Sequence, residues 1–388
     1  MGQANTLLVQ PILEKIAAGA AQADLSRTVD DSVIQAIKGN PVMAMTASEE
    51  LQGSNAGAWA VACELEAVAA ACGSTGWCLW NHLCTFHLFC GVLGPDNADQ
   101  LSDITQNAQW VCFPAGAGTA SQGVLEGDEV VISGQASFGS GSRYADYAGA
   151  SFRAPNGEGV AFALVDLHAE GVAIDPTWQA MSLRASATDD IHYQQTRVAA
   201  RRMVPFPFRY REVFRDPARP MIHPRYREDW VALSDLWLGA MAVGVSHAAL
   251  VEVCDSIKDR IAIAGVQVAQ RPTVHVNLGQ AAAQISAARD TVKQACEETD
   301  SRVAAGVIPT ESDYLRQMAA GMQALSLCDE AMRLLLRVQG GNGLREGHSF
   351  ERRYRDFQAM PLHINAHRDR VTEQYGRDLL GLPTENPF

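Results

Sequence analysis

The strongest candidates for acid–base chemistry are two histidines near the C-terminal end of the chain. His363 and His367 are four residues apart and follow Pro361, a spacing that can place both imidazoles on one face of a helix. Such a pair can bind a metal ion, but no His-Glu-x-x-His pattern and no third ligand accompany it. We therefore expect no metal site. His363 is either a structural residue at a helix start or a group that exchanges protons near neutral pH.

Ser140 is a second candidate, because it lies in the run Gly139-Ser140-Gly141. Runs of this composition usually form a turn. The run is not a dinucleotide-binding fingerprint, since it lacks the third glycine and the following helix. The sequence also contains no phosphate-binding loop of the P-loop type. On its own, the run would carry no functional prediction.

The composition bounds the class of protein. The formal net charge is −13, from 44 acidic and 31 basic residues, and no basic run stands out, which argues against a nucleic-acid or anionic-membrane surface. Residues 1–10 have neither a basic region nor a long apolar stretch, so no signal peptide is expected. The most apolar segment, residues 77–93, is interrupted by polar residues and is too short for a convincing membrane span. We expect a cytoplasmic protein.

Nine cysteines are present, and four of them, Cys72, Cys78, Cys84 and Cys90, recur every six residues. That spacing does not place them on one helix face. No Cys-x-x-Cys pair occurs, which removes the main support for a zinc or redox site. The cysteines are therefore predicted to be buried, reduced thiols.

Helix and strand patterns divide the first two thirds of the chain into two parts. Residues 1–107 carry helical stretches, among them an Ala-rich segment and an apolar helix, at 56–71 and about 75–92. Residues 108–222 contain short segments rich in β-branched or aromatic residues, at 110–113, 130–137, 160–165 and 191–198, with turn signals between them. Strands at this spacing predict a small β-barrel or sandwich.

The last part, residues 223–388, is helical again. Apolar residues repeat at intervals of three and four in three segments, 233–251, 278–295 and 315–335. Thr310 and Asp313 resemble a capping box, and a final helix is expected after Pro361. Four long helices with short connections predict a bundle. The predicted fold is thus mostly α with a central β domain: an N-terminal helical domain, a small β-barrel and a C-terminal four-helix bundle.

This order resembles the acyl-CoA dehydrogenase superfamily, and local motifs agree with it. Two motifs look like its aromatic-hydroxylase branch: Cys72-Gly73-Ser74-Thr75-Gly76-Trp77, and residues 137–141 followed by Tyr144-Ala145-Asp146-Tyr147. Four others resemble superfamily segments: Ser182-Leu183-Arg184-Ala185-Ser186, and residues 338–343, 353–356 and 375–381. Each motif is weak alone. Their order along the chain is the specific part.

The resemblance does not decide the chemistry, because one fold can carry different reactions. An acyl-CoA dehydrogenase needs a carboxylate within hydrogen-bond reach of the carbon next to the thioester carbonyl. The positions where the superfamily carries this glutamate correspond here to Ile364, next to His363, and to Ser234, next to Asp235. Neither position holds a glutamate. This departure favours hydroxylation over dehydrogenation.

The resemblance to the hydroxylase branch implies the oxygenase component of a two-component, reduced-flavin-dependent monooxygenase. A separate NAD(P)H-dependent flavin reductase would supply reduced FMN or FAD. Oxygen would add at flavin C4a, and the resulting hydroperoxide, protected from water, would hydroxylate a small aromatic substrate, phenolic or indolic. The implied catalytic residues are His363, Ser140 and His82. His87 competes with His82, and a hydrogen-bonded core histidine is an equal alternative for His82.

The resemblance also implies residues that hold the flavin between the β domain and the bundle. Arg260 matches an arginine that meets flavin phosphate, which a guanidinium can bind with two hydrogen bonds. Gln339, Gly340 and Gly341 match a segment that approaches the cofactor from a neighbouring subunit, which implies a homo-oligomer, in this branch a tetramer. The plain alternatives are a cation and a glycine that complete helix C-termini.

Trp110, Phe113 and Ser140 complete the flavin-binding candidates. Ser140 would lie near flavin N5 and C4a. Trp110 and Phe113 would offer aromatic surface, although such residues are more often plain core. Arg337 stands where the superfamily has a glutamine, which leaves FMN and FAD both open.

Two other functions are compatible with the residues. Asp235 could be a displaced base in a true acyl-CoA dehydrogenase. Retention of FAD and reduction of an electron acceptor by acyl-CoA would support that function. The chain could also bind flavin without transferring oxygen to any substrate.

Overall fold

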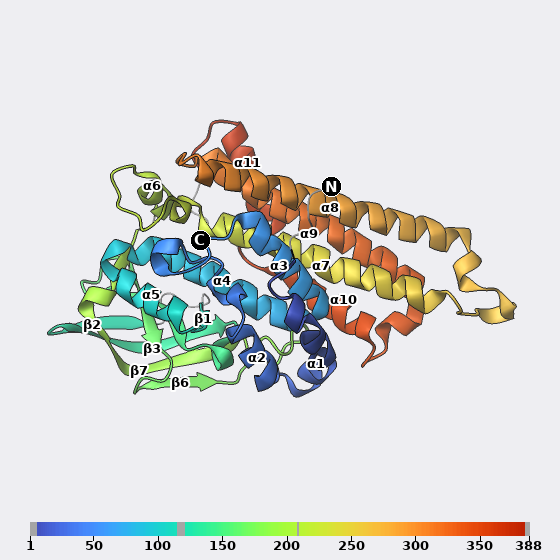
Figure 1. The fold of residues 1–388 in the computed structure, drawn as a ribbon, viewed down its shortest axis with the longest axis horizontal. Helices are drawn as coiled ribbons and strands as arrows, with labels where there is room; N and C mark the ends of the chain where they lie inside the picture. Colours follow the sequence, from blue (N-terminus) through green and yellow to red (C-terminus); the bar gives the residue numbers. More distant parts are fainter. Residues whose placement is uncertain (1–5, 115–120, 208, 385–388) are drawn as a thin grey trace.

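The computed structural model describes residues 6–114, 121–207 and 209–384, so part of the segment 1–10 lies outside the described residues. N-terminal helices, a β-sheet and a C-terminal helical bundle follow one another along the chain. Figure 1 shows the sheet and the bundle on different sides of the molecule, with α4 (Gly73–Leu93) between them. The predicted order of the three parts is confirmed.

The N-terminal part places one apolar helix at the centre of the molecule. Its elements are α1 (Leu13–Ser26), α2 (Asp31–Lys38), α3 (Ala58–Ala71), α4 and α5 (Ala98–Gln106). Cys72 has an extended backbone and separates α3 from α4. A Cβ atom on Gly76 would lie 2.9 Å from the Cα atom of Ala69, so a glycine there lets the two helices pack closely. α4 is buried over almost its whole length.

The β part is one mixed sheet. Its strands are β1 (Val111–Cys112), β2 (Gln122–Glu126), β3 (Glu129–Gly139), β4 (Tyr147–Arg153), β5 (Val160–Asp166), β6 (Val172–Asp175), β7 (Asp189–Ala199) and β8 (Val204–Phe206). Their order is β6-β7-β3-β2-β4-β5-β8, and β1 pairs with β4. Within the part of the chain that the structure describes, β6 and β8 are not paired with each other. The predicted closed barrel is therefore not confirmed.

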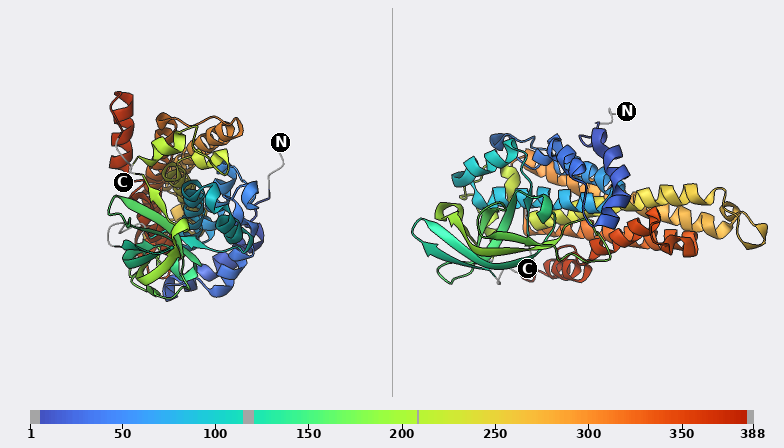
Figure 2. Two further views of the ribbon diagram at one scale, coloured as in Figure 1. Left: turned by 90° about the vertical axis from the view of Figure 1, so that its left-hand side faces the viewer. Right: turned by 90° about the horizontal axis from the view of Figure 1, so that it is seen from below.

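The C-terminal part contains three long helices and several short ones. They are α6 (Tyr210–Arg215), α7 (Trp230–Ile257), α8 (Pro272–Ala304), α9 (Glu311–Gln339), α10 (Ser349–Ala359) and α11 (Arg368–Leu379). The final helix expected after Pro361 is α11, but it is short, so the described part of the bundle has three long helices and not the predicted four. The unpredicted α10 precedes it and does not continue into it, because Pro361 in the 3-10 turn Met360–Leu362 cannot donate a helical hydrogen bond. The capping box of Thr310 and Asp313 at the start of α9 is confirmed. Figure 2 shows the α7–α8 hairpin projecting as an arm.

α7 is the core helix of the bundle. By length and composition it could cross a membrane, but 72% of its apolar window is buried inside the protein, which is typical of a core helix. A Cβ atom on Gly321 of α9 would lie 2.3 Å from the carbonyl oxygen of Asp235. The two helices therefore pack backbone to backbone at the level of Asp235.

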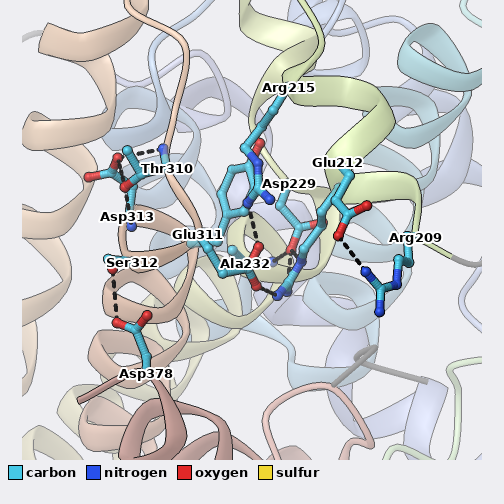
Figure 3. Close-up of polar contacts among 12 residues, drawn as sticks. Arg209, Glu212, Arg215, Asp229, Ala232, Thr310, Glu311, Ser312, Asp313 and Asp378 are labelled. Carbon is cyan, nitrogen blue, oxygen red and sulfur yellow. Dashed lines mark hydrogen bonds and ion pairs between the residues drawn. The ribbon is translucent and has the colours of Figure 1, made fainter. Parts of the chain in front are cut away.

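Buried ion pairs hold the start of α7. The carboxylate of Asp229 accepts hydrogen bonds from the backbone N–H groups of Val231 and Ala232, which caps the helix. Arg211 donates to Asp229 at 2.6 Å and to Glu311 of α9 at 2.7 Å. Figure 3 shows how Asp229 and Glu311 converge between α7 and α9. This network fixes the position from which α7 enters the core.

All nine cysteines are free thiols. Seven are buried, namely Cys72, Cys78, Cys84, Cys90, Cys112, Cys296 and Cys328, whereas Cys63 and Cys254 are partly exposed. The predicted burial is confirmed for the seven. Burial raises the pKa of Cys90 and of Cys112 to about 12, so these thiols stay protonated and unreactive at neutral pH.

Candidate active site

Three motifs that are far apart in the sequence meet at the start of α4. The Asp356 carboxylate accepts a hydrogen bond of 2.7 Å from the backbone N–H of Leu183, and Ser74 Oγ accepts one of 3.3 Å from Ala185. A Cβ atom on Gly73 would lie 3.1 Å from Asp356. Leu183 has a φ of 49°, a left-handed conformation that a branched residue adopts only under constraint. Asp356 therefore holds the loop before β7 against α4.

Ser140 lies beyond the end of β3, at the centre of a buried hydroxyl chain. Trp77 Nε1 donates a hydrogen bond of 2.9 Å to Ser140 Oγ. The hydroxyls of Ser140 and Thr188 are 3.0 Å apart, and those of Thr188 and Ser186 are 2.6 Å apart. If Ser186 donates to Thr188 and Thr188 donates to Ser140, the hydrogen of Ser140 is free for a bound molecule.

His363 follows the 3-10 turn after α10 and contacts two tryptophan rings edge-on. Its ring centroid is 5.6 Å from Trp77 and 4.9 Å from Trp80. His363 Nδ1 accepts a hydrogen bond of 3.4 Å from the backbone N–H of Asn365, so the neutral ring carries its proton on Nε2. Burial, with the charge of Arg370, lowers the pKa of His363 to about 4. The imidazole is therefore neutral at pH 7.

The structure thus brings two of the predicted residues to the same tryptophan. Ser140 accepts from the indole N–H of Trp77, and His363 packs against the Trp77 ring. We call Trp77, Trp80, Ser140 and His363 the tryptophan–histidine cluster. Its members come from the β-sheet, α4 and the segment after α10, so three parts of the fold must be in place to form it.

Two further contacts fix this cluster against α7. Trp80 Nε1 donates to the backbone carbonyl of Ser234 at 2.9 Å, and the Asn365 side chain donates to Ser234 Oγ at 3.2 Å. Asn365 and Thr188 were not singled out from the sequence. Neither residue stands in a pattern that marks a site, and each acts through a partner in a distant segment. Only the fold reveals their roles.

Asp235 is fully buried next to this cluster. No hydrogen-bond partner reaches either of its carboxylate oxygens in the described part of the chain. Burial raises the pKa of Asp235 well above its usual value, an effect that Arg370 only partly offsets. These surroundings therefore favour the protonated form of the carboxyl group. A protonated carboxyl can donate a hydrogen bond, but it is not ready to remove a proton.

His82 and His87 are both committed to backbone groups. His82 Nδ1 accepts from the backbone N–H of Val111 at 2.9 Å, and Nε2 lies 3.1 Å from the carbonyl oxygen of Met43. His87 Nε2 lies 2.9 Å from the carbonyl oxygen of Glu228. Burial lowers the pKa of His82 to about 4 and that of His87 to about 3. For His82 this geometry favours the core histidine over the predicted catalytic role.

Replacing His82 with alanine tests that interpretation. The change leaves the Val111 N–H and the Met43 carbonyl unpaired and opens a cavity, so we expect a loss of about 3 kcal/mol in the free energy of unfolding. Flavin affinity should change little. Urea unfolding of the purified variant measures the loss, and His168→Ala, at an exposed histidine, is the control. A stable variant that no longer transfers oxygen would restore the catalytic role of His82.

The buried histidines also predict acid sensitivity. The folded pKa of His82 is about 4, below its unfolded value of about 6.5. Between these values the unfolded chain binds a proton that the folded chain does not. The free energy of unfolding should therefore fall as the pH drops from about 6.5 to 4, by about 3 kcal/mol for this group alone. In His82→Ala, the slope of unfolding free energy against pH should be smaller, and an unchanged slope would contradict the assignment.

Trp110 and Phe113 lie inside the protein. Phe113 packs with the rings of Phe89, Phe162 and Trp230, and Trp110 is fully buried. This enclosure favours a core role over the predicted cofactor contact for both residues. Trp110 Nε1 nevertheless has no hydrogen-bond acceptor among the described residues. It is a buried donor beside the Ser140 turn, since a Cβ atom on Gly141 would lie 3.3 Å from it.

Arg260 and Gln339 lie together at the far end of the bundle. Arg260 Nη1 donates to Gln339 Oε1 at 3.4 Å, and Gln339 Nε2 donates to Ser256 Oγ at 2.8 Å. Gln339 is buried, whereas Gly340 and Gly341 are exposed and have open space around them. From Ser234, which contacts the tryptophan–histidine cluster, to the end of α7 is about 35 Å along the helix. Within one chain, the flavin-binding candidates Arg260 and Gln339 therefore lie far from the tryptophan–histidine cluster.

Apolar side chains are exposed beside the tryptophan–histidine cluster and also at the arm formed by α7 and α8. Next to Ser140 and His363, Phe138 is 57% exposed, Leu362 71% and Ile364 60%. At the arm, the exposed apolar residues include Ile261, Ile263 and Val266, and Leu344 is exposed in the turn after α9. Exposed apolar groups that gather in this way mark surfaces that a ligand or another protein covers.

The bundle matches a known family. Residues 236–368 match the model of the acyl-CoA dehydrogenase C-terminal domain. These residues form an acyl-CoA dehydrogenase C-terminal domain. This domain supplies most of α7, then α8 to α10 and His363, so one of the four members of the tryptophan–histidine cluster belongs to it.

Whole-chain comparisons extend the match beyond this acyl-CoA dehydrogenase domain. The indole-3-acetate monooxygenase of Acinetobacter baumannii is 23% identical over 92% of this chain and 88% of its own length. The flavin-dependent monooxygenase oxygenase subunit HsaA of Rhodococcus jostii is 24% identical over 93% of this chain and 94% of its own length. The structure of XiaF from Streptomyces in complex with FADH2 and glycerol is 21% identical, with a TM-score of 0.87, over 97% of this chain and 94% of that chain. The chain has the acyl-CoA dehydrogenase-like fold of flavin-dependent monooxygenases.

Proposed function

We propose that this protein is the oxygenase component of a two-component monooxygenase that uses reduced flavin and molecular oxygen to hydroxylate a small aromatic compound. The observation that carries the proposal is the tryptophan–histidine cluster, in which a neutral His363 offers Nε2 and Ser140 offers its hydroxyl. The relatives support it, since they are monooxygenases that share nearly the whole length of the chain.

The residues of the cluster fit a flavin. Flavin is a flat aromatic group with hydrogen-bonding atoms on its edge, and the cluster offers exposed apolar surface at Phe138 and Leu362 beside the hydroxyl of Ser140. Reduced flavin, when bound, supplies the two electrons that activate oxygen for transfer to the substrate. FMN and FAD both remain compatible with these residues.

The cluster can hold a bound molecule by a hydrogen bond and keep water away. His363 Nε2 carries the ring proton, so it can donate a hydrogen bond to an oxygen atom that gains negative charge during oxygen transfer. The indole rings of Trp77 and Trp80 contact His363 on two sides, which reduces the access of water to it. Asn365 keeps the ring in the tautomer that this role requires.

We infer that a neighbouring copy of the chain completes the flavin site. Arg260 and the exposed Gly340 and Gly341 are about 35 Å from Ser234 along α7, so they reach a flavin at His363 only from another copy. The exposed apolar residues of the arm, such as Ile263, suit burial in such a contact. This reasoning supports a homo-oligomer, and the resemblance to the hydroxylase branch implies that it is a tetramer. A separate NAD(P)H-dependent reductase and a cytoplasmic location complete the proposal.

Replacing Arg260 with glutamate should weaken the binding of reduced flavin by about tenfold or more, because a carboxylate would repel the flavin phosphate. Anaerobic fluorescence titration measures the affinity. Lys258→Glu is the matched control, since Lys258 is an exposed cation at the same helix end. Mixed oligomers of Arg260→Glu and His363→Ala subunits should regain activity in part, because some sites then receive both native residues. Equal losses in Arg260→Glu and Lys258→Glu would contradict a specific contact.

The proposed function is tested by supplying chemically reduced FMN or FAD to the purified protein, then aerated buffer and a panel of phenols and indoles. We expect hydroxylated product and less hydrogen peroxide than free flavin releases. A true acyl-CoA dehydrogenase would instead reduce an electron acceptor with acyl-CoA and lose that activity in Asp235→Asn. The burial of Asp235, which raises the pKa of its carboxyl group, does not favour this alternative. If every aromatic compound in the panel gives hydrogen peroxide and no hydroxylated product, the proposal is refuted.

A further inference from the structure

A cavity of about 440 Å³ lies where the start of α3, the end of α8 and the 3-10 turn Pro224–Arg227 meet. None of the residues of the tryptophan–histidine cluster lines it. Its lining combines apolar side chains, among them Leu233, Trp237 and Val303, with polar ones, among them Asn55, His223 and Arg225. The volume is in the range of sites for small molecules.

Arg225 is a buried cation that the carboxylate of Asp300 attracts from beyond ion-pair distance. It is 6% exposed, and its Nε has no hydrogen-bond acceptor in the described residues. No carboxylate of the described chain forms an ion pair with it within 4.0 Å. Asp300 lines the same cavity, but its oxygens accept hydrogen bonds from the backbone N–H groups of Ala58 and Trp59. A buried, unpaired guanidinium is costly, and an anion in the cavity would offset that cost.

Around Arg225, the side chains of Asn55 and His223 leave one hydrogen-bond donor without an acceptor. His223 Nδ1 accepts from the backbone N–H of Arg225 at 3.1 Å, so the neutral ring carries its proton on Nε2. That nitrogen lies 3.4 Å from the Asn55 amide nitrogen, which is also a donor, while the Asn55 oxygen accepts from Arg225 Nη1 at 2.9 Å. Turning the amide would pair His223 and unpair Arg225 instead. In either orientation of the amide, the Asn55 oxygen can accept from only one of the two donors, Arg225 Nη1 or His223 Nε2, and the other donor stays unpaired.

A second unpaired atom reaches the cavity from α4. His87 lines the cavity and is 2% exposed. Because its Nε2 faces the Glu228 carbonyl, Nε2 carries the proton and Nδ1 is an acceptor. Nδ1 has no partner among the described residues. A ligand with an O–H or N–H group could supply one.

The geometry points to a binding site for a small carboxylate, whose oxygens accept hydrogen bonds from Arg225, Asn55 and His223. Arginine and carboxylate form charge-assisted pairs, often with two hydrogen bonds. The apolar side chains of Leu233 and Trp237 suit an aromatic or short aliphatic body, and a hydroxyl on that body can donate to His87. The chemical class is therefore a hydroxylated aromatic carboxylate or a close relative. This site does not depend on the proposed flavin reaction.

Calorimetric titration of the flavin-free protein with para-hydroxybenzoate tests the site. We expect binding to the native chain and none to the uncharged para-hydroxybenzamide. Arg225→Gln should weaken binding by about tenfold or more. Ala304→Trp should do the same by filling the cavity, since Ala304 is an exposed residue of its lining and the polar groups stay native. Arg209→Gln, at an exposed arginine paired with Glu212, should bind like the native chain.

Other outcomes decide against the site. If native protein does not bind para-hydroxybenzoate at millimolar concentration, or if Arg225→Gln and Ala304→Trp both bind like native protein, the assignment is wrong. Binding of inorganic phosphate without para-hydroxybenzoate would overturn the carboxylate class. His363→Ala should leave the affinity unchanged, and a loss in that variant would move the ligand to the tryptophan–histidine cluster. Failure of the flavin reaction would leave each of these results intact.

Discussion

Replacing His363 with alanine should lower the yield of hydroxylated product per reduced flavin by about a hundredfold or more. The change removes the hydrogen-bond donor Nε2, and the loss of one preorganised donor at a reacting oxygen costs a factor of this size. Flavin should still be oxidised by oxygen, with hydrogen peroxide as the main product. Product analysis together with a peroxide assay measures both quantities. His367→Ala, four residues further on, is the matched control and should keep native coupling.

The pH dependence separates this role from a structural one. With a pKa of about 4, His363 stays neutral far below pH 6.5. Oxygen transfer should therefore persist on lowering the pH until about pH 4 to 5, as far as the fold survives. An activity that falls with an apparent pKa near 6.5 would show a fully solvated imidazole and contradict the partly buried arrangement with Trp77 and Trp80. Loss of folding in His363→Ala, seen by circular dichroism, would assign the residue a structural role.

Replacing Asp229 with alanine should lower the free energy of unfolding by about 3 to 5 kcal/mol. The change leaves Arg211 as a buried cation with Glu311 as its remaining partner, and it removes the cap of α7. Urea unfolding gives the value. Glu212→Ala is the matched control, because Glu212 pairs with the exposed Arg209 on the same segment (Figure 3).

The control should change the free energy of unfolding by less than about 0.5 kcal/mol, as exposed ion pairs contribute little. The test is the difference in the free energy of unfolding between Asp229→Ala and Glu212→Ala. Similar losses in Asp229→Ala and Glu212→Ala would contradict the buried network. A secondary effect is also expected, because α7 carries Ser234, which binds Trp80 and Asn365. Asp229→Ala should therefore also reduce the coupling of flavin oxidation to product formation.

The sequence was informative where local patterns decide the structure. The apolar repeats predicted α7, α8 and α9, and the pair Thr310 and Asp313 predicted the start of α9. Strands rich in β-branched residues, such as β3, β5 and β7, were found. β4, with the sequence YAGASFR, was not found as a strand, because small residues give no β signal. Its pairing with β5 is a tertiary property. Sheet closure was likewise not readable from strand spacing.

The candidate site shows the same difference between what sequence motifs reveal and what only tertiary contacts reveal. Ser140 and His363 were named through a resemblance in motif order, and the structure joins them through Trp77. His82 was ambiguous, because a buried histidine and a catalytic one look alike until the backbone partners are known. Its partner Val111 is 29 positions away. Thr188 carried no local signal, since its role depends on a hydroxyl in a different segment.

The most direct test of the central claim uses isotopically heavy oxygen gas. The protein, chemically reduced flavin and an aromatic substrate found in the panel are mixed under this gas, and the product is analysed by mass spectrometry. We predict that one heavy oxygen atom enters each hydroxylated product, and that His363→Ala forms little of it while still oxidising flavin. Product oxygen that comes from water, or flavin oxidation that yields peroxide alone with native protein, would contradict the account.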